Sequence, residues 1–130
     1  MTESSHIRKG RVLIIDDEPD MTHIVKVGLE RKRFEVDSFT DPVLALQNFK
    51  SGLYQLLILD IKMPRMDGMD LLDRIKKEDD KIKVCFFTAS EDFAANCENV
   101  FNNSKDKFLI ILKPISIPTM TKQIEQFLTR

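Results

Sequence analysis

The chain carries the stretch Val-Leu-Ile-Ile-Asp-Asp at residues 12–17, in which four apolar residues are followed at once by two acids. Three further apolar runs, at residues 56–59, 84–87 and 109–112, also end at a polar residue. Such runs are typical of strands buried on both faces of a parallel sheet, whose ligands bind at the carboxyl ends of the strands. The polar residues that follow the runs are therefore expected to meet in one cleft. They are Asp16, Asp17, Asp60, Thr88 and Lys113.

Amphipathic helical segments separate the apolar runs. Residues 19–31 place their apolar side chains on one helical face. Asp41 followed by Pro42 is typical of a helix N-terminus, and Gly52 stands just beyond the expected end of that helix. Residues 34–39 predict a short second strand. Further helices are predicted at residues 67–78, at residues 93–101 and after Ser116.

A strand followed by a helix thus occurs five times. Right-handed crossovers of this length predict a doubly wound α/β fold. We expect a five-stranded parallel sheet of flavodoxin-like (βα)5 type, with strand order 2-1-3-4-5 and helices on both faces.

Length and charge restrict the function. The 130 residues suit one folded domain at residues 11–130, preceded by a flexible polar leader at residues 1–10. With 20 Lys and Arg against 21 Asp and Glu, we expect neither nucleic acid nor a membrane as partner. No membrane-spanning run or signal peptide is apparent, and Cys85 and Cys97 are expected to be buried free thiols, so a cytoplasmic location is predicted.

The acids after the first and third strands predict a metal site. Asp16, Asp17 and Asp60 would repel one another in a partly desolvated cleft unless a cation lay among them. Carboxylate oxygens suit Mg²⁺, which retains water and takes a substrate phosphate as a further ligand. A carboxylate beside Mg²⁺ can serve as a ligand or as a nucleophile that forms an aspartyl phosphate. Taken singly, the acids could equally cap a helix or begin a loop.

The fourth and fifth strand ends add groups that suit a phosphoryl ligand. Thr88 supplies a hydroxyl donor, and the small residues Ala89 and Ser90 leave a path of approach open. Lys113 supplies a flexible positive charge suited to phosphate.

These residues resemble the receiver domain of two-component response regulators, over residues 11–129. The resemblance rests on Asp16-Asp17 after the first strand and on Leu-Asp-Ile-Lys-Met-Pro-Arg-Met-Asp-Gly around Asp60. Thr88-Ala89 and Lys113-Pro114 complete it. The chain looks like a single receiver domain of the chemotaxis-regulator kind.

The resemblance implies a role for each acid. Asp60 would accept a phosphoryl group from a phosphohistidine. Mg²⁺ would be bound by Asp17, by Asp60 and by the backbone carbonyl of Lys62, with Asp16 acting through water.

The resemblance also implies how the phosphoryl group is held. Thr88, with Ala89 beside it, would bind a phosphoryl oxygen, and Lys113 would pair with Asp60 or its phosphate. The peptide bond between Lys113 and Pro114 is commonly cis in such domains.

Three features depart from the family pattern. Ile110 stands where an aromatic switch residue is usual, so we expect signalling to depend less on a side-chain flip in the fifth strand. A polar segment at residues 102–107 replaces the usual Gly-Ala, so we expect the fourth helix to be short, shifted or mobile. Lys62 and Ser90 flank the path of an attacking water and are expected to tune the phosphoryl lifetime.

The leading hypothesis is a stand-alone phosphoacceptor that is not a turnover enzyme. Its partners would be a sensor histidine kinase or phosphotransfer protein and an effector acted on in trans. It would be a monomer or a weak dimer through the surface of the fourth helix, fifth strand and fifth helix, where Lys105, Lys107, Lys122 and Gln126 are candidate exposed residues. The alternatives are a phosphorelay intermediate, a small Mg²⁺-dependent phosphatase and a receiver that only makes protein contacts.

Overall fold

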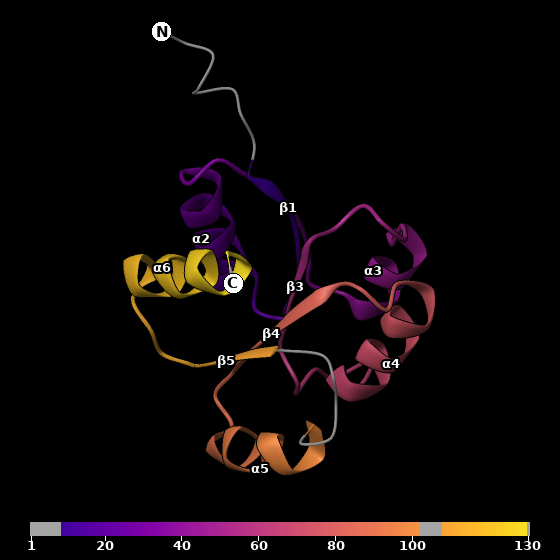
Figure 1. Ribbon diagram of the computed structural model, residues 1–130. Helices are drawn as coiled ribbons and strands as arrows, with labels where there is room; N and C mark the ends of the chain where they lie inside the picture. The colour runs from indigo at the N-terminus through magenta and orange to yellow at the C-terminus, as the bar shows by residue number, and fades with distance from the viewer. Residues whose placement is uncertain (1–8, 102–107, 130) are drawn as a thin grey trace, which may run out of the picture.

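The computed structural model describes residues 9–101 and 108–129. Their strands form one parallel sheet in the order β2-β1-β3-β4-β5, the predicted flavodoxin-like topology (Figure 1). The strand order reverses between β1 and β3. These two strands pair in parallel, with Val12 opposite Leu56 and Ile15 opposite Leu59. The strands are β1 (Gly10–Ile15), β2 (Phe34–Phe39), β3 (Leu56–Leu59), β4 (Lys83–Thr88) and β5 (Phe108–Leu112).

Helices cover both faces of the sheet. The helices α2 and α6 lie side by side on one face, and α3 and α4 lie on the other (Figure 1). Within the described ranges no helix is long and apolar enough to span a membrane. The helices are α2 (Pro19–Glu30), α3 (Pro42–Asn48), α4 (Gly68–Glu78), α5 (Glu91–Phe101) and α6 (Ile117–Leu128).

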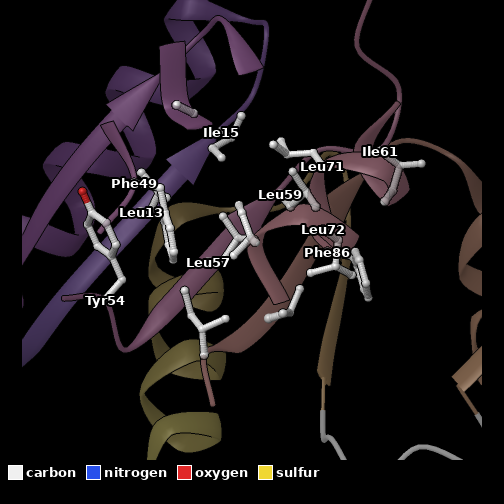
Figure 2. Packing of buried hydrophobic residues seen from close by; sticks show 14 of the residues in the cluster. Leu13, Ile15, Phe49, Tyr54, Leu57, Leu59, Ile61, Leu71, Leu72 and Phe86 are labelled. Atoms are coloured by element: carbon white, nitrogen blue, oxygen red, sulfur yellow. The ribbon is translucent and has the colours of Figure 1, made fainter. Parts of the chain in front are cut away.

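Successive residues of the central strands point into two separate hydrophobic cores, one on each face of the sheet. Leu13 and Leu59 pack in the core under α3 and α4, where Figure 2 shows Leu13 near Phe49 and Leu59 near Leu71. Val12 and Ile58 point the other way, into the core under α2 and α6. Because successive side chains of a strand point to opposite faces, a strand covered on both sides must be apolar at every position.

The fifth strand is less buried than its apolar sequence predicts. Of its residues only Ile111 is buried, and Leu112 is 40% exposed. The prediction of burial on both faces is wrong here because β5 is an edge strand, with a neighbour on one side only.

Several predicted boundaries shift. Gly10 begins β1 and does not belong to the predicted leader, of which residues 1–8 lie outside the described residues. The helix α3 ends at Asn48, because Phe49 takes an extended backbone that allows its ring to stack on Tyr54; Gly52 lies in the turn beyond, with φ +80°.

The fourth helix of the chain, α5, is eleven residues long. The polar segment at residues 102–107, with Lys105 and Lys107, lies outside the described residues, as does the side chain of Cys97. Cys85 is a buried free thiol as predicted, and Lys122 and Gln126 are exposed.

Candidate functional site

Three carboxylates meet at the carboxyl edge of the sheet. Asp16 and Asp17 follow β1, and Asp60 follows β3, the strand paired beside it. One oxygen of each carboxylate lies within 4.8 Å of those of the other two. Asp16 and Asp60 are buried, and Asp17 is half-buried. The switch point of the strand order therefore gathers the acids that the sequence predicts there.

The protein environment raises the pKa of two of these acids. Burial, followed by the negative charge of Asp16, raises the pKa of Asp60 to about 6. Burial also raises the pKa of Asp16, although the hydrogen bond from Lys113 partly offsets it. The site therefore carries uncompensated negative charge when Asp60 is ionised, which a bound cation would relieve.

Lys113 enters the site from the end of β5. Its Nζ donates to Asp16 Oδ2 at 2.8 Å and to Glu18 Oε1 at 2.9 Å, but it lies 3.7 Å from Asp60 Oδ2. Burial would lower the pKa of Lys113, but the hydrogen bonds to Asp16 and Glu18 outweigh it and the pKa is raised. The expected pairing with Asp60 is thus secondary here, because Asp16 and Glu18 offer closer acceptors. The bond between Lys113 and Pro114 is cis.

Glu18 is the site residue that sequence reasoning missed. It occupies the N-cap position of α2, but its side chain makes no capping hydrogen bond. Its carboxylate contacts Lys113 from the rim of the cleft. The sequence offered one signal, a third acid directly after Asp16 and Asp17.

Thr88 connects the site with the first turn of α5. Its hydroxyl is buried at the end of β4 and accepts a hydrogen bond from Ser90 N at 3.1 Å. The Ser90 hydroxyl in turn accepts from Phe93 N at 3.1 Å, as an N-cap residue does. Ala89 between them is exposed, which leaves the approach past Thr88 open.

An aromatic cluster stands near the position that lacks the usual aromatic. Ile110 pairs with Phe86 across the strands, and Phe86 contacts Phe93 edge-on at 5.1 Å and Phe108 at 5.9 Å between ring centroids. Aromatic side chains of β4, α5 and β5 therefore meet around Phe86, which precedes Thr88 by two residues.

The loop after Asp60 connects β3 with α4. Residues 61–67 line a shallow pocket of about 490 Å³, and Lys62 is exposed on it. Gly68 closes the loop, since its N donates to Ile61 O at 2.9 Å. A Cβ at Gly68 would lie 2.6 Å from Asp60 O, so glycine is required for this close approach.

The donor set suits a hard divalent cation. The three carboxylates place their oxygens within 4.8 Å of one another, and burial, followed by the charge of Asp16, raises the pKa of Asp60. Mg²⁺ or a similar ion would use these oxygens as ligands and would offset their charge. His6 lies outside the described residues and His23 is exposed on α2; among the described residues the cluster of possible metal ligands consists of Asp16, Asp17 and Asp60.

The fold and the site together define a flavodoxin-like α/β protein with an acidic site at its switch point, the class that includes receiver domains. The model of the response regulator receiver domain family matches residues 12–125. The chain therefore belongs to the response regulator receiver domain family, a family of signalling domains.

Known proteins agree with this assignment. The response regulator receiver protein CpdR of Brucella abortus is 29% identical over 118 residues, which are 91% of this chain and 96% of CpdR. The regulatory protein VanRB of Enterococcus faecalis is 31% identical over 120 residues, 92% of this chain but 53% of VanRB. The chain thus spans about half the length of some relatives and nearly all of CpdR.

A solved structure extends the similarity to the fold. The response regulator TrrA of Thermotoga maritima, in complex with Mg²⁺ and BeF, superposes with a TM-score of 0.74 at 25% identity. The match covers 92% of this chain and 98% of TrrA.

Proposed function

We propose that the chain is a phosphoacceptor switch in which Asp60 receives a phosphoryl group from a phosphohistidine. The observation that carries this proposal is the convergence of Asp16, Asp17 and Asp60 with Thr88 and Lys113 at one edge of the sheet, in a member of the receiver family. The donor would be a sensor histidine kinase or a phosphotransfer protein.

In the proposed reaction a carboxylate oxygen of Asp60 attacks phosphorus. The new O–P bond forms as the N–P bond of the phosphohistidine breaks, and the departing imidazole keeps the electron pair. Asp60 suits the role because it lies at the floor of the cleft with both a cation site and Lys113 beside it. Thr88 would donate a hydrogen bond from its hydroxyl to a phosphoryl oxygen, past the small Ala89.

Mg²⁺ would be held by Asp17, by Asp60 and by the carbonyl of Lys62, with Asp16 acting through water. When bound, the ion supplies positive charge that offsets the charge of the transferred group. The clustering of the three carboxylates supports this assignment, and burial, followed by the charge of Asp16, raises the pKa of Asp60 in the same cleft.

The signal would leave the site through the first turn of α5. If Thr88 turns its hydroxyl toward a phosphoryl group, the hydrogen bond to Ser90 N is altered, and Ser90 is the residue that caps Phe93. Phe93 packs on Phe86, so this route reaches the aromatic cluster without an aromatic residue at position 110. NMR comparison of the free and beryllofluoride-bound protein tests it: a large reorientation of Ile110 with Phe93 unmoved would refute the route.

The rate of phosphoryl loss would be tuned by two residues that flank the cleft. Lys62 is exposed on the loop beside Asp60, and Ser90 follows Thr88 by two residues. Both stand where a water attacking the phosphoryl group would pass.

The output would be exerted in trans on a partner of the α5-β5-α6 surface, by a monomer or weak dimer in the cytoplasm. The match to nearly the whole of CpdR, a response regulator receiver protein, supports action through a partner. A role as a phosphorelay intermediate is the second candidate, because such a protein uses the same acceptor chemistry. A phosphatase is disfavoured because position 62 is Lys, which leaves Asp60 without a neighbouring general acid at that position.

Intact mass measurement tests the proposal. Incubation with acetyl phosphate and Mg²⁺ should add about 80 Da, one phosphoryl group, to the wild type and nothing to Asp60→Asn. The substitution Asp73→Asn, on the exposed side of α4, is the matched control and should retain the adduct. No adduct from acetyl phosphate or from a phosphohistidine donor would favour a receiver that only makes contacts, and turnover of free phosphoesters would favour an enzyme.

A further inference from the structure

Lys113 is held by two carboxylates of very different exposure. The Asp16 side chain is 2% exposed and accepts from Nζ at 2.8 Å, whereas the Glu18 side chain is 58% exposed and accepts at 2.9 Å. Asp60 lies 3.7 Å away, beyond hydrogen-bond distance. The ammonium group is therefore drawn toward the β1 side of the cleft and away from the proposed phosphoacceptor.

The backbone of Glu18 is fixed by the start of α2. Its N–H donates to Asp16 Oδ1 at 3.0 Å, and its carbonyl accepts from Thr22 N at 3.0 Å and from Thr22 Oγ1 at 2.7 Å. The side chain takes no part in capping the helix. The backbone of Glu18 is thus held by the helix, whereas its side chain contacts Lys113 instead of capping the helix.

We propose that Glu18 is a positioning residue that keeps Lys113 on the β1 side of the cleft until a phosphoryl group on Asp60 draws it across. This inference rests on the proposed function and concerns the same site. Glu18 is the partner that Lys113 can release, since water solvates an exposed carboxylate again at little cost. Release of Asp16 instead would leave a buried charge unpaired, which is far more costly.

The proposal predicts opposite effects on a cation and on an anion. Loss of the Glu18 contact frees Lys113 for an anion at Asp60, so the affinity for the anion should rise. The same loss removes negative charge near the cation site, so the affinity for Mg²⁺ alone should stay the same or fall. Because Glu18 is exposed and screened by solvent, we expect a change of roughly two- to fivefold.

Three variants of the full chain separate contact from charge. Glu18→Gln removes the charge, whereas Glu18→Asp keeps it on a side chain one methylene shorter, which draws it back from Lys113. Asp20→Asn removes a neighbouring exposed charge from the first turn of α2 and serves as the control. Titration calorimetry measures Mg²⁺ alone and then beryllofluoride at saturating Mg²⁺.

Both Glu18→Gln and Glu18→Asp should bind beryllofluoride more tightly than the wild type, and Asp20→Asn should match the wild type. The gain should shrink as the salt concentration rises. The inference is overturned if Glu18→Asp behaves as the wild type, since charge alone would then suffice, or if Glu18→Gln weakens both ligands, as general damage to the site would. A wild type that binds Mg²⁺ but neither beryllofluoride nor a phosphoryl group would overturn the proposed function, and this inference with it.

Discussion

The substitution Asp60→Asn is expected to stabilise the metal-free protein at pH 7, because it removes a charge from a crowded cleft. Burial and the charge of Asp16 raise the pKa of Asp60 from 3.8 to about 6 in the folded chain. The folded state therefore holds this proton more tightly than the unfolded state does. The stability that Asp60 contributes is complete below the unfolded pKa and is lost as the pH rises through about 6. A shift of this size corresponds to at most about 3 kcal/mol, so we expect a gain of roughly 1–3 kcal/mol.

Urea unfolding in EDTA measures this gain. The difference between Asp60→Asn and the wild type should be largest at pH 7 and should nearly vanish at about pH 3, below the unfolded pKa of 3.8, where the carboxyl is protonated in both the folded and the unfolded state. Added Mg²⁺ should stabilise the wild type more than the variant. The control Asp73→Asn, from an exposed position, should change stability little at either pH. A variant no more stable than the wild type at pH 7, or equally stabilised at both pH values, would refute the reasoning.

Three further predictions concern other parts of the molecule. Tyr54→Phe removes a hydroxyl that donates to Asp37 at 2.7 Å, so urea unfolding should show a loss of about 0.5–1.5 kcal/mol. Since burial raises the pKa of Tyr54 from 10.0 to about 12, the wild type should lose stability as the pH rises through this range, and circular dichroism of Tyr54→Phe should lack that step. Gly68→Ala would place a Cβ 2.7 Å from the backbone of Ile61, so a loss of roughly 1–3 kcal/mol is expected; unchanged stability would mean that the loop can yield. Lys62→Asn and Lys62→Ala should change the rate at which the phosphorylated protein loses its adduct, and equal rates in both variants and the wild type would remove Lys62 from the mechanism.

The sequence predicts the sheet well because a parallel strand covered on both faces is apolar at every position. In β1, β3 and β4 the apolar runs coincide with strands buried on both faces, and their carboxyl ends share one edge. The residues that follow them must therefore meet, although long stretches of chain separate Asp16 from Asp60. The site could thus be located from the sequence, because Asp16 and Asp60 each come directly after an apolar run that forms a strand.

The remaining features depend on contacts that leave no periodic signal. Glu18 reaches Lys113 only because the end of β5 lies across the cleft from the start of α2. The exposure of Leu112 follows from its place on an edge strand, which its apolar neighbours do not reveal. The contact between Phe86 and Phe93 depends on how α5 packs on the sheet, a feature of tertiary structure.

Identification of the modified carboxylate tests the central claim most directly. Borohydride reduces an aspartyl phosphate to homoserine, which marks the phosphorylated residue permanently. After treatment with acetyl phosphate and Mg²⁺, the tryptic peptide spanning residues 51–62 should carry the mark, and Asp60 is its only acidic residue. Homoserine in the peptide of residues 12–26, which contains Asp16 and Asp17, with peptide 51–62 unmodified, would contradict the assignment of Asp60 as the phosphoacceptor.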